Sequence, residues 1–233
     1  MLDCTYASQH ARGVVAVITE SGVEQLFECV PEGLRELAER GVVKRYRKGT
    51  LIIDEGSSGD TLYILLKGSV KAFSSHVSER EITFSIDKAG DYFGEMSLDG
   101  GVRSASVIAL EPTICAVVTA HTVWQFVETS PAFARELIKK LISRARWVTQ
   151  RARDLALLDV YGRVTRLLDE LATIAGENGA RKIPERLTHL AIAGRVGASR
   201  EMVSRLLKDL ERGGFIQVEH GCLTLQKRLP ARW

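Results

Sequence analysis

The chain has 233 residues, of which 45% are hydrophobic and 26% are charged, and its formal net charge is +3. This composition is typical of a globular protein, and the length suffices for two domains that each bury a core. No apolar stretch approaches the roughly 20 residues that a membrane helix needs, and the N-terminus lacks a basic segment followed by an apolar core. We therefore expect no membrane association and a cytoplasmic location.

Charge is distributed unevenly along the chain. Residues 1–160 contain 19 Lys and Arg against 21 Asp and Glu, whereas residues 161–233 contain 13 against 8. A basic segment attached to a slightly acidic body indicates a module that binds a polyanion.

The potential metal ligands are scattered. Neither the cysteines nor the histidines approach the spacing of a zinc or iron–sulfur site, and we expect lone thiols and no metal cofactor. The cysteines are Cys4, Cys29, Cys115 and Cys222.

Between residues 42 and 120, short β-type runs alternate with glycine turns. The runs cover residues 42–46, 50–53, 62–66, 69–73, 82–86 and 104–109. Short strands at this spacing predict a small β-barrel or roll. A helix is expected before it, over residues 31–40, with Leu34 and Leu37 on one face, whereas residues 1–20 show no clear pattern.

A long helix is predicted from Ser130 to about Leu158. Ser130 offers an N-cap hydroxyl, and Pro131 suits the first helical position. Apolar residues then recur at steps of four and three, as in a coiled-coil seam. A helix packed on its own domain is the alternative, but a length of roughly 28 residues favours pairing with a second copy in a homodimer. The seam residues are Leu141, Ala145, Val148, Ala152 and Leu155.

The remaining chain has the pattern of a winged helix-turn-helix. A helix from Tyr161, a glycine-rich turn at 176–179, a helix near 188–195, a turn at Gly197, a helix from Ser199 to Gly213–Gly214 and a hairpin around His220–Gly221 follow in order. The predicted fold is α+β, with a sensor β-roll (1–129), a dimerisation helix and hinge (130–160) and a DNA-binding domain (161–233).

The second helix of this motif carries the strongest signal for DNA binding. Ser199 can cap the helix and donate its hydroxyl to a phosphate, and Arg200, Glu201 and Arg205 lie near the N-terminal end that meets base edges. Arginine can bind guanine O6 and N7, while glutamate can accept from cytosine N4. Taken alone, the pattern also fits an amphipathic helix with solvated charges.

The segment Gly197-Ala-Ser-Arg-Glu-Met-Val-Ser-Arg205 resembles the recognition helix of the cyclic AMP receptor protein family, within the Crp/Fnr superfamily of bacterial regulators. The resemblance implies base contacts in a TGTGA-like half-site and two phosphate contacts. Leu190 departs from the family, whose close relatives have a glutamine that contacts the DNA backbone. The predicted DNA-binding residues are Thr188, Ser199, Arg200, Glu201, Ser204 and Arg205.

A second cluster lies in Phe93-Gly-Glu-Met-Ser-Leu98 and Arg103-Ser-Ala105. Gly94 permits a close backbone approach, Arg103 can neutralise a phosphate, Ser104 can donate a hydroxyl, and Glu95 can accept from a ribose hydroxyl. By itself the pattern also fits a surface loop with an Arg–Glu pair.

The wider pattern resembles the glycine framework of cyclic-nucleotide-binding domains. It includes Lys48-Gly-Thr-Leu-Ile-Ile-Asp-Glu-Gly56, Gly59-Asp-Thr-Leu-Tyr63 and Gly68-Ser-Val70, and the whole resemblance spans roughly residues 30–233. It implies Glu95 on the ribose 2′-hydroxyl and Arg103 with Ser104 on the cyclic phosphate. The segment from Leu155 to Arg163 resembles the family's hinge and places Thr149 and Gln150 at positions that contact adenine. The predicted ligand residues are Gly94, Glu95, Met96, Ser97, Arg103, Ser104, Thr149 and Gln150.

The resemblance implies a regulator whose dimer conformation and binding to a palindromic DNA site depend on a cyclic nucleotide, with cyclic AMP as the expected effector. Gln150, longer than the family's serine, leaves cyclic di-GMP or no ligand as alternatives. Cys4 and Cys29 alone cannot hold an iron–sulfur cluster, and nothing supports haem. An enzyme is the competing class, but no catalytic triad, carboxylate pair, P-loop or metal spacing supports it. RNA polymerase is the expected further partner.

Overall fold

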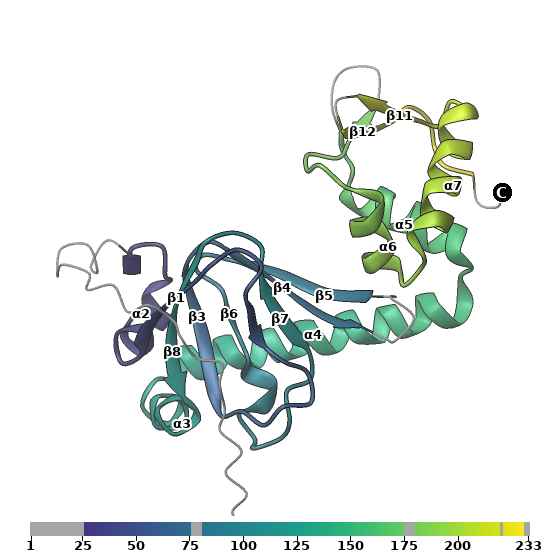
Figure 1. The fold of residues 1–233 in the computed structure, drawn as a ribbon. Coiled ribbons are helices and arrows are strands. Elements are labelled where there is room, and N and C mark those ends of the chain that lie inside the picture. The colour runs from purple at the N-terminus through teal and green to yellow at the C-terminus, as the bar shows by residue number, and fades with distance from the viewer. Residues whose placement is uncertain (1–25, 76–80, 175–179, 220, 231–233) are drawn as a thin grey trace, which may run out of the picture. The chain divides into compact units, whose positions relative to one another are not determined.

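The computed structural model describes residues 26–75, 81–174, 180–219 and 221–230 (Figure 1). These residues form two compact units. The first contains the described residues up to Ala72 together with Ile86–Ala134, and the second contains Phe73–Ser85 and the chain from Arg135 onward. Within the described ranges, no helix combines the length and the apolar character needed to cross a membrane.

The β-rich part of the chain is built on two four-stranded sheets in the described ranges. The order of the first is β1 (Val42–Tyr46), β8 (Thr113–Thr119), β3 (Thr61–Lys67) and β6 (Tyr92–Phe93). The order of the second is β2 (Leu51–Ile53), β7 (Ser106–Ala109), β4 (Ser69–Ser75) and β5 (Glu81–Lys88). This arrangement confirms the predicted β-rich sensor fold, and the predicted runs differ from the observed strands by a few residues at their ends.

Strand β3 lies in the interior of the first sheet. It pairs antiparallel with β8, where Tyr63 faces Val117, and with β6, where Tyr63 faces Phe93. Ile64 and Leu65 are completely buried. The uninterrupted apolar run in this strand follows from its interior position, because both of its faces are covered.

Two strands of this sheet and the helix that follows β8 were not predicted. Strands β6 and β8 and helix α3 (Ala120–Thr129) were absent from the expected elements. The Thr119 hydroxyl caps α3 by accepting from the Thr122 amide at 3.3 Å. An apolar run such as that of β8 does not by itself distinguish a strand from a buried helical segment. The spacing of apolar residues therefore did not predict where β8 ends and α3 begins.

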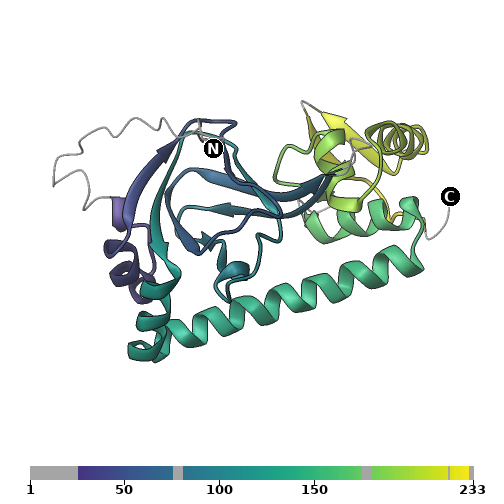
Figure 2. The ribbon, with the colours of Figure 1, turned by 60° about the horizontal axis from the view of Figure 1, so that its bottom comes forward.

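Two predicted helices are present. Helix α2 (Glu32–Glu39) buries Leu34 and Leu37, as expected. Helix α4 (Pro131–Leu157) is one continuous element of 27 residues and begins directly after Ser130 (Figure 2). Near its start, the Phe133 ring packs 5.4 Å from that of Phe126 and 6.2 Å from that of Tyr92, measured between centroids.

The C-terminal part is a winged helix-turn-helix, as predicted. Its helices are α5 (Val160–Leu171), α6 (His189–Val196) and α7 (Arg200–Arg212), and its sheet has the order β11 (Ile216–Glu219), β12 (Cys222–Leu225), β10 (Arg181–Lys182) and β9 (Thr173–Ile174). Strands β9 and β10, which precede the other two along the chain, were not predicted. The expected turn at 176–179, His220, Cys4 and residues 1–20 lie outside the described residues.

Side-chain caps and a glycine define the helix-turn-helix. The hydroxyls of Thr188 and Ser199 accept from the amides of Ala191 and Met202, at 3.1 and 3.2 Å, and so begin α6 and α7. Gly197 ends α6 in the left-handed conformation, with φ of +65°. These three residues, all singled out in the sequence, set the turn between the two helices.

Candidate ligand cassette and nucleic-acid interface

The second sequence cluster, residues 93–98 and 103–105, is called the cassette below. It begins where β6 passes into the short 3₁₀ helix η1 (Glu95–Ser97). Gly94, between them, has φ of +89°. A Cβ atom at this position would lie 2.9 Å from both Arg103 Nη1 and the Thr61 carbonyl oxygen. Backbone conformation and lack of space therefore both require glycine here, and the group that approaches its backbone is the Arg103 side chain.

The Arg103 guanidinium is held inside the cassette. Its Nη1 donates to Ser97 Oγ at 2.7 Å, to the Thr61 carbonyl at 2.9 Å and to the Gly94 carbonyl at 3.1 Å. Its Nη2 donates to Thr61 Oγ1 at 2.8 Å. Only 6% of Arg103 is exposed. The structure thus brings the predicted residues Gly94, Ser97 and Arg103 together and adds Thr61, which sequence reasoning missed.

The backbone at Arg103 is also fastened to the connection between β2 and β3. The Arg103 amide donates to the Ser57 carbonyl at 2.8 Å, and the Arg103 carbonyl accepts from the Gly56 amide at 2.8 Å. The Arg103 guanidinium carbon lies 5.8 Å from the centroid of the Tyr63 ring, which stacks on Phe93. Both ends of this arginine are therefore fixed by the motifs Lys48–Gly56 and Gly59–Tyr63, which the sequence had identified only as a glycine framework.

The other predicted cassette residues differ in their exposure. The Glu95 side chain is buried, whereas Met96 and Ser104 are exposed. Glu95 and Arg103 are a buried acidic and a buried basic residue eight positions apart, and charged side chains are seldom buried without a polar ligand or partner. The role of Ser104 on a phosphate stays a prediction.

Helix α3 contributes a contact to the cassette that was not foreseen. The Trp124 indole Nε1 donates to the Leu98 carbonyl, directly after η1, at 2.9 Å. This bond fixes the end of the cassette turn against α3. Because α3 itself was not predicted, no sequence signal pointed to Trp124.

Thr149 and Gln150 belong to the second unit, and their contact with a base stays a prediction. Thr149 Oγ1 donates to the Ala145 carbonyl of its own helix at 2.9 Å. Gln150 Nε2 donates to Asp154 Oδ1 at 2.9 Å, and the same oxygen accepts from Arg166 Nη1 of helix α5 at 2.7 Å. Through these two bonds, the buried Asp154 carboxylate joins the predicted ligand residue Gln150 to α5, the first helix of the winged helix-turn-helix.

The recognition helix α7 has two distinct faces. Val203, Leu207 and Leu210 are buried in the core of the domain. On the opposite side the side chains of Arg200, Glu201 and Arg205 are exposed, and none has a hydrogen bond or ion pair to the part of the chain that the structure describes.

The other predicted DNA residues lie close to this face along the chain. Thr188 and Ser199 are the caps of α6 and α7, and Ser204 is half-buried on α7. Leu190, the departure from the family, is exposed on α6. Exposed cations near the N-terminus of a helix that begins at a capping hydroxyl match the docking of a helix in the major groove.

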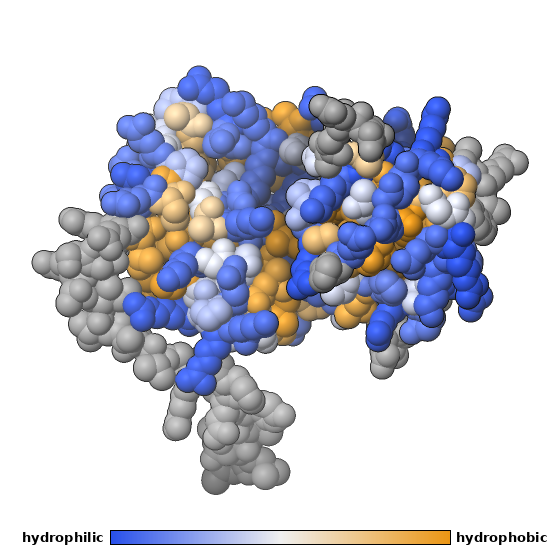
Figure 3. Space-filling model, turned by 90° about the horizontal axis from the view of Figure 1, so that it is seen from above, coloured by the Kyte–Doolittle hydropathy of each residue, from blue (hydrophilic) through white to orange (hydrophobic). Residues whose placement is uncertain are grey.

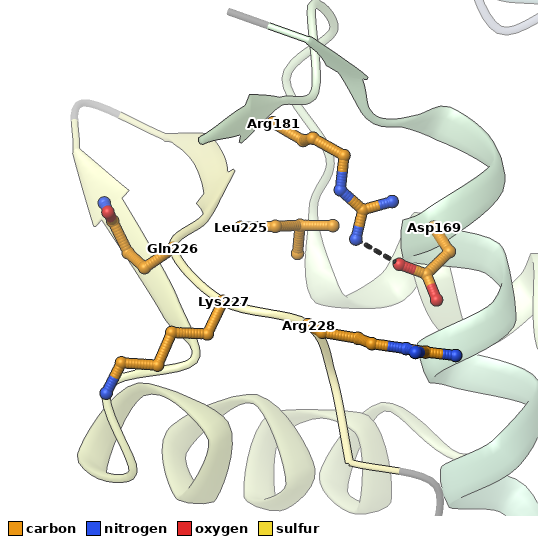
Figure 4. A pocket seen from close by; sticks show the side chains of 6 residues that line it. All are labelled: Asp169, Arg181, Leu225, Gln226, Lys227 and Arg228. Carbon is orange, nitrogen blue, oxygen red and sulfur yellow. Dashed lines mark hydrogen bonds and ion pairs between the residues drawn. The ribbon is translucent and has the colours of Figure 1, made fainter. Parts of the chain in front are cut away.

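A polar pocket lies elsewhere in the DNA-binding domain (Figure 4). It is lined by Asp169, Arg181, Leu225, Gln226, Lys227 and Arg228. Arg181 forms an ion pair with Asp169 at 2.6 Å, and the side chains of Lys227 and Arg228 point away from each other in Figure 4. The cations of this pocket therefore do not converge on one point as a phosphate site requires.

The apolar seam predicted on α4 is uncovered in the single chain. Leu141, Val148 and Leu155 are exposed, and so are Ile138 and Ile142. On the face seen from above in Figure 3, which does not identify the α4 seam, hydrophobic residues are interspersed among hydrophilic ones. An exposed apolar stripe along a long helix is typical of a surface that pairs with another chain.

The described residues contain no cluster of His, Cys, Asp and Glu that could hold a metal ion. Of the three cysteines in the described residues, Cys115 on strand β8 is the most buried, and burial raises the pKa of its thiol to about 12. A thiol with a raised pKa stays protonated and is a poor metal ligand or nucleophile.

Comparison with known proteins decides the family. The model of the cyclic nucleotide-binding domain matches residues 43–130, and that of the Crp-like helix-turn-helix domain matches residues 162–228. The chain belongs to the Crp/Fnr family of transcription regulators. The predicted resemblance and fold class are confirmed, and because this family is not enzymatic, so is the assignment as a regulator rather than an enzyme.

Two relatives from this family align with most of the chain. The CRP-like cAMP-activated global transcriptional regulator of Mycobacterium tuberculosis (strain H37Rv) is 31% identical over 206 residues, which are 87% of this chain and 91% of that protein. The cAMP-activated global transcriptional regulator CRP of Pasteurella multocida (strain Pm70) is 32% identical over 191 residues, or 77% and 87%.

Among solved structures, the c-di-GMP responsive global regulator CLP of Xanthomonas campestris aligns with a TM-score of 0.72 at 25% identity, over 84% of this chain and 98% of that one. A CooA mutant from Carboxydothermus hydrogenoformans aligns with a TM-score of 0.71 at 21% identity, over 82% and 86%, and shows the shared fold.

Proposed function

We propose that this chain is a homodimeric, cytoplasmic regulator that binds a palindromic DNA site when cyclic AMP occupies its cassette. The observation that carries the proposal is the buried Arg103, which is bonded to Gly94 and, like the buried Glu95, lies in a segment that matches the cyclic nucleotide-binding domain. Arg103 would hold the cyclic phosphate and Glu95 the ribose 2′-hydroxyl. The names of the Mycobacterium and Pasteurella relatives support cyclic AMP as the effector.

The same proposal assigns the remaining segments. The exposed seam of α4 would pair two copies, and each α7 would enter one of two major grooves about 34 Å apart. A ligand can control this geometry only by binding one arrangement more tightly than the other. Contact with RNA polymerase and the division at residues 129/130 and 160/161 belong to the same proposal.

The second candidate is a regulator of the same type that responds to cyclic di-GMP or needs no ligand. It is favoured by the likeness to the c-di-GMP responsive regulator of Xanthomonas and by Gln150, whose amide is bonded to Asp154. Both candidates share the DNA-binding function and differ only in what the cassette binds.

Calorimetric titration with cyclic AMP, cyclic GMP and cyclic di-GMP at fixed salt distinguishes the two candidates. We expect micromolar binding of cyclic AMP that is lost in Arg103→Leu and retained in Arg47→Leu, a matched control because Arg47 is exposed in the same unit. Circular dichroism of Arg103→Leu checks that the variant is folded. Binding of cyclic di-GMP alone, or of no nucleotide, would refute cyclic AMP as the effector and favour the second candidate.

DNA binding is tested separately by fluorescence anisotropy with a palindromic TGTGA-containing duplex and a scrambled duplex. We expect cyclic AMP to strengthen binding to the palindrome more than to the scrambled sequence. Equal binding to both, with or without the nucleotide, would contradict sequence-specific regulation.

A further inference from the structure

Among the described residues, the hydrogen bonds of the Arg103 guanidinium come from its Nη1 and Nη2 atoms and none from Nε. A planar guanidinium has five N–H groups, two on each Nη and one on Nε. Both hydrogens of Nη1 and one of Nη2 are directed to Thr61, Gly94 and Ser97. Within the described part of the chain, Nε–H and the second Nη2–H of Arg103 have no acceptor, and these two groups can lie parallel along one edge of a guanidinium. Such an edge can form paired hydrogen bonds with two oxygens of a phosphate.

Ser97 and Thr61, the two residues whose hydroxyls bind Arg103, hold it in different ways. Ser97 Oγ donates its hydrogen to the Gly94 carbonyl at 3.2 Å, so its oxygen is turned to accept from Arg103. Ser97 is 1% exposed, which leaves water little opportunity to replace it. Thr61 accepts twice, through its carbonyl and its Oγ1, and therefore holds both terminal nitrogens of the guanidinium. Together the two residues oppose rotation of the guanidinium.

Residue 59 lies at the remaining edge. A Cβ atom on Gly59 would lie 2.3 Å from Arg103 Nε and 2.6 Å from Nη2. Gly59 does not have a positive φ, so its backbone conformation would accept any residue. The need for glycine here therefore comes from the guanidinium, because a side chain at residue 59 would occupy the place of an anionic oxygen at the two parallel donors.

We propose that Thr61 and Ser97 are positioning residues that present the Nε–Nη2 edge of Arg103 to the phosphate of a cyclic nucleotide, and that Gly59 keeps this edge free of side-chain atoms. The inference rests on the proposed function, since it specifies how the cassette arginine is aimed at its ligand. Gly59 and Thr61 lie outside the cassette, and the inference gives each of them a role in ligand binding.

The first test is titration with cyclic AMP of variants that remove one hydroxyl. Thr61→Val preserves the shape of the side chain and is expected to weaken affinity about five- to tenfold, as loss of one hydrogen bond does. Ser97→Ala should have a similar effect, and Thr61→Ser should restore affinity to within about twofold of the wild type. Thr50→Val is the matched control, because no side-chain hydrogen bond of Thr50 is present in the described part of the chain.

Gly59→Ala tests the other half of the proposal. The added methyl group should obstruct the two donors and displace the guanidinium, so that cyclic AMP affinity falls more than roughly tenfold. Gly33→Ala is its control, since a Cβ at Gly33 would have no atom within 4 Å.

A measurement without nucleotide separates positioning from general stability. In nuclear magnetic resonance spectra of arginine-labelled protein, a fixed guanidinium gives separate Nη1 and Nη2 signals, whereas a rotating one gives an average. We expect separate Arg103 signals in the wild type and in Thr61→Ser, and averaged signals in Thr61→Val and Ser97→Ala. The Arg103 signals are identified by their loss in Arg103→Lys.

The outcomes distinguish this inference from the proposed function. If the wild type binds cyclic AMP and Thr61→Val and Ser97→Ala bind it as tightly as Thr50→Val does, the positioning role is wrong and the proposed function stands. Averaged Nη signals in the wild type would also overturn the positioning role. If the wild type binds no cyclic nucleotide, the proposed function fails and this inference fails with it.

Discussion

The arginines that we propose to bind anions in two regions of this molecule are held in opposite ways. Arg103 in the cassette is buried and directs several donors to its own chain, whereas Arg200 and Arg205 on the recognition helix are exposed and have no partner among the described residues. A small ligand inside a domain can be met by a guanidinium whose orientation is already fixed. Side chains that enter a DNA groove remain hydrated and adaptable until the bases replace water.

The largest expected effect is on the stability of the cassette. Arg103→Leu leaves the buried Ser97 hydroxyl and the partly buried acceptors of Thr61 and Gly94 without their donor. We therefore expect urea unfolding to show a loss of about 3 kcal/mol in the free energy of unfolding, whereas Arg200→Leu should change it by less than about 0.5 kcal/mol. If Arg103→Leu and Arg200→Leu lowered the free energy of unfolding equally, the contrast between a buried, fixed arginine and an exposed one would be wrong. Arg47→Leu serves as the control within the first unit.

The recognition helix should show the opposite pattern. Arg200→Ala is expected to cost about 1–3 kcal/mol in binding to the specific duplex and to relax the preference at one base pair of each half-site. Arg212→Ala, at the other end of α7 and about 18 Å away, should change specific and random binding little. Anisotropy titrations at fixed salt measure both. An equal loss on specific and random DNA would reassign Arg200 to a phosphate contact.

A smaller effect is expected at the junction of α4 and α5. Asp154→Asn removes the charge that accepts from Gln150 and Arg166, and because Asp154 is buried while Arg166 is partly exposed, we expect a loss of about 1–2 kcal/mol in stability. Glu170→Gln disturbs the exposed bond to the same arginine and should cost less than about 0.5 kcal/mol. Urea unfolding followed by circular dichroism compares the two variants, and equal costs would contradict a structural role for the buried carboxylate.

The smallest effect at neutral pH concerns Cys115, whose contribution to stability changes only in alkali. Burial raises the pKa of its thiol from 9.0 to about 12, so the unfolded chain loses this proton at lower pH than the folded one. Stability from this group is fully present below pH 9 and is lost between pH 9 and 12, by at most about 1.4 kcal/mol per pH unit. Urea unfolding under reducing conditions at pH 8 and 10 should show a weaker decline for Cys115→Ala than for the wild type. Parallel declines would exclude Cys115 as a source of alkaline sensitivity.

Local patterns accounted for much of the fold. The four-and-three spacing of apolar residues on α4, the caps at Thr188 and Ser199 and the turn at Gly197 act between residues a few positions apart, and all were found in the expected places. Strand β8 and helix α3 were missed because the boundary between them depends on pairing with β1 and β3, which are distant in sequence.

For the candidate site, the residue types together with the family resemblance predicted that Gly94, Glu95 and Arg103 bind a phosphate and a ribose, and that Arg200, Glu201 and Arg205 read bases. Only the tertiary structure decided which groups hold Arg103: the bonds from its guanidinium to Thr61 join positions 42 residues apart. Short-range periodicity and capping are contained in neighbouring residues, whereas such a contact exists only after the strands have paired and brought the two segments together.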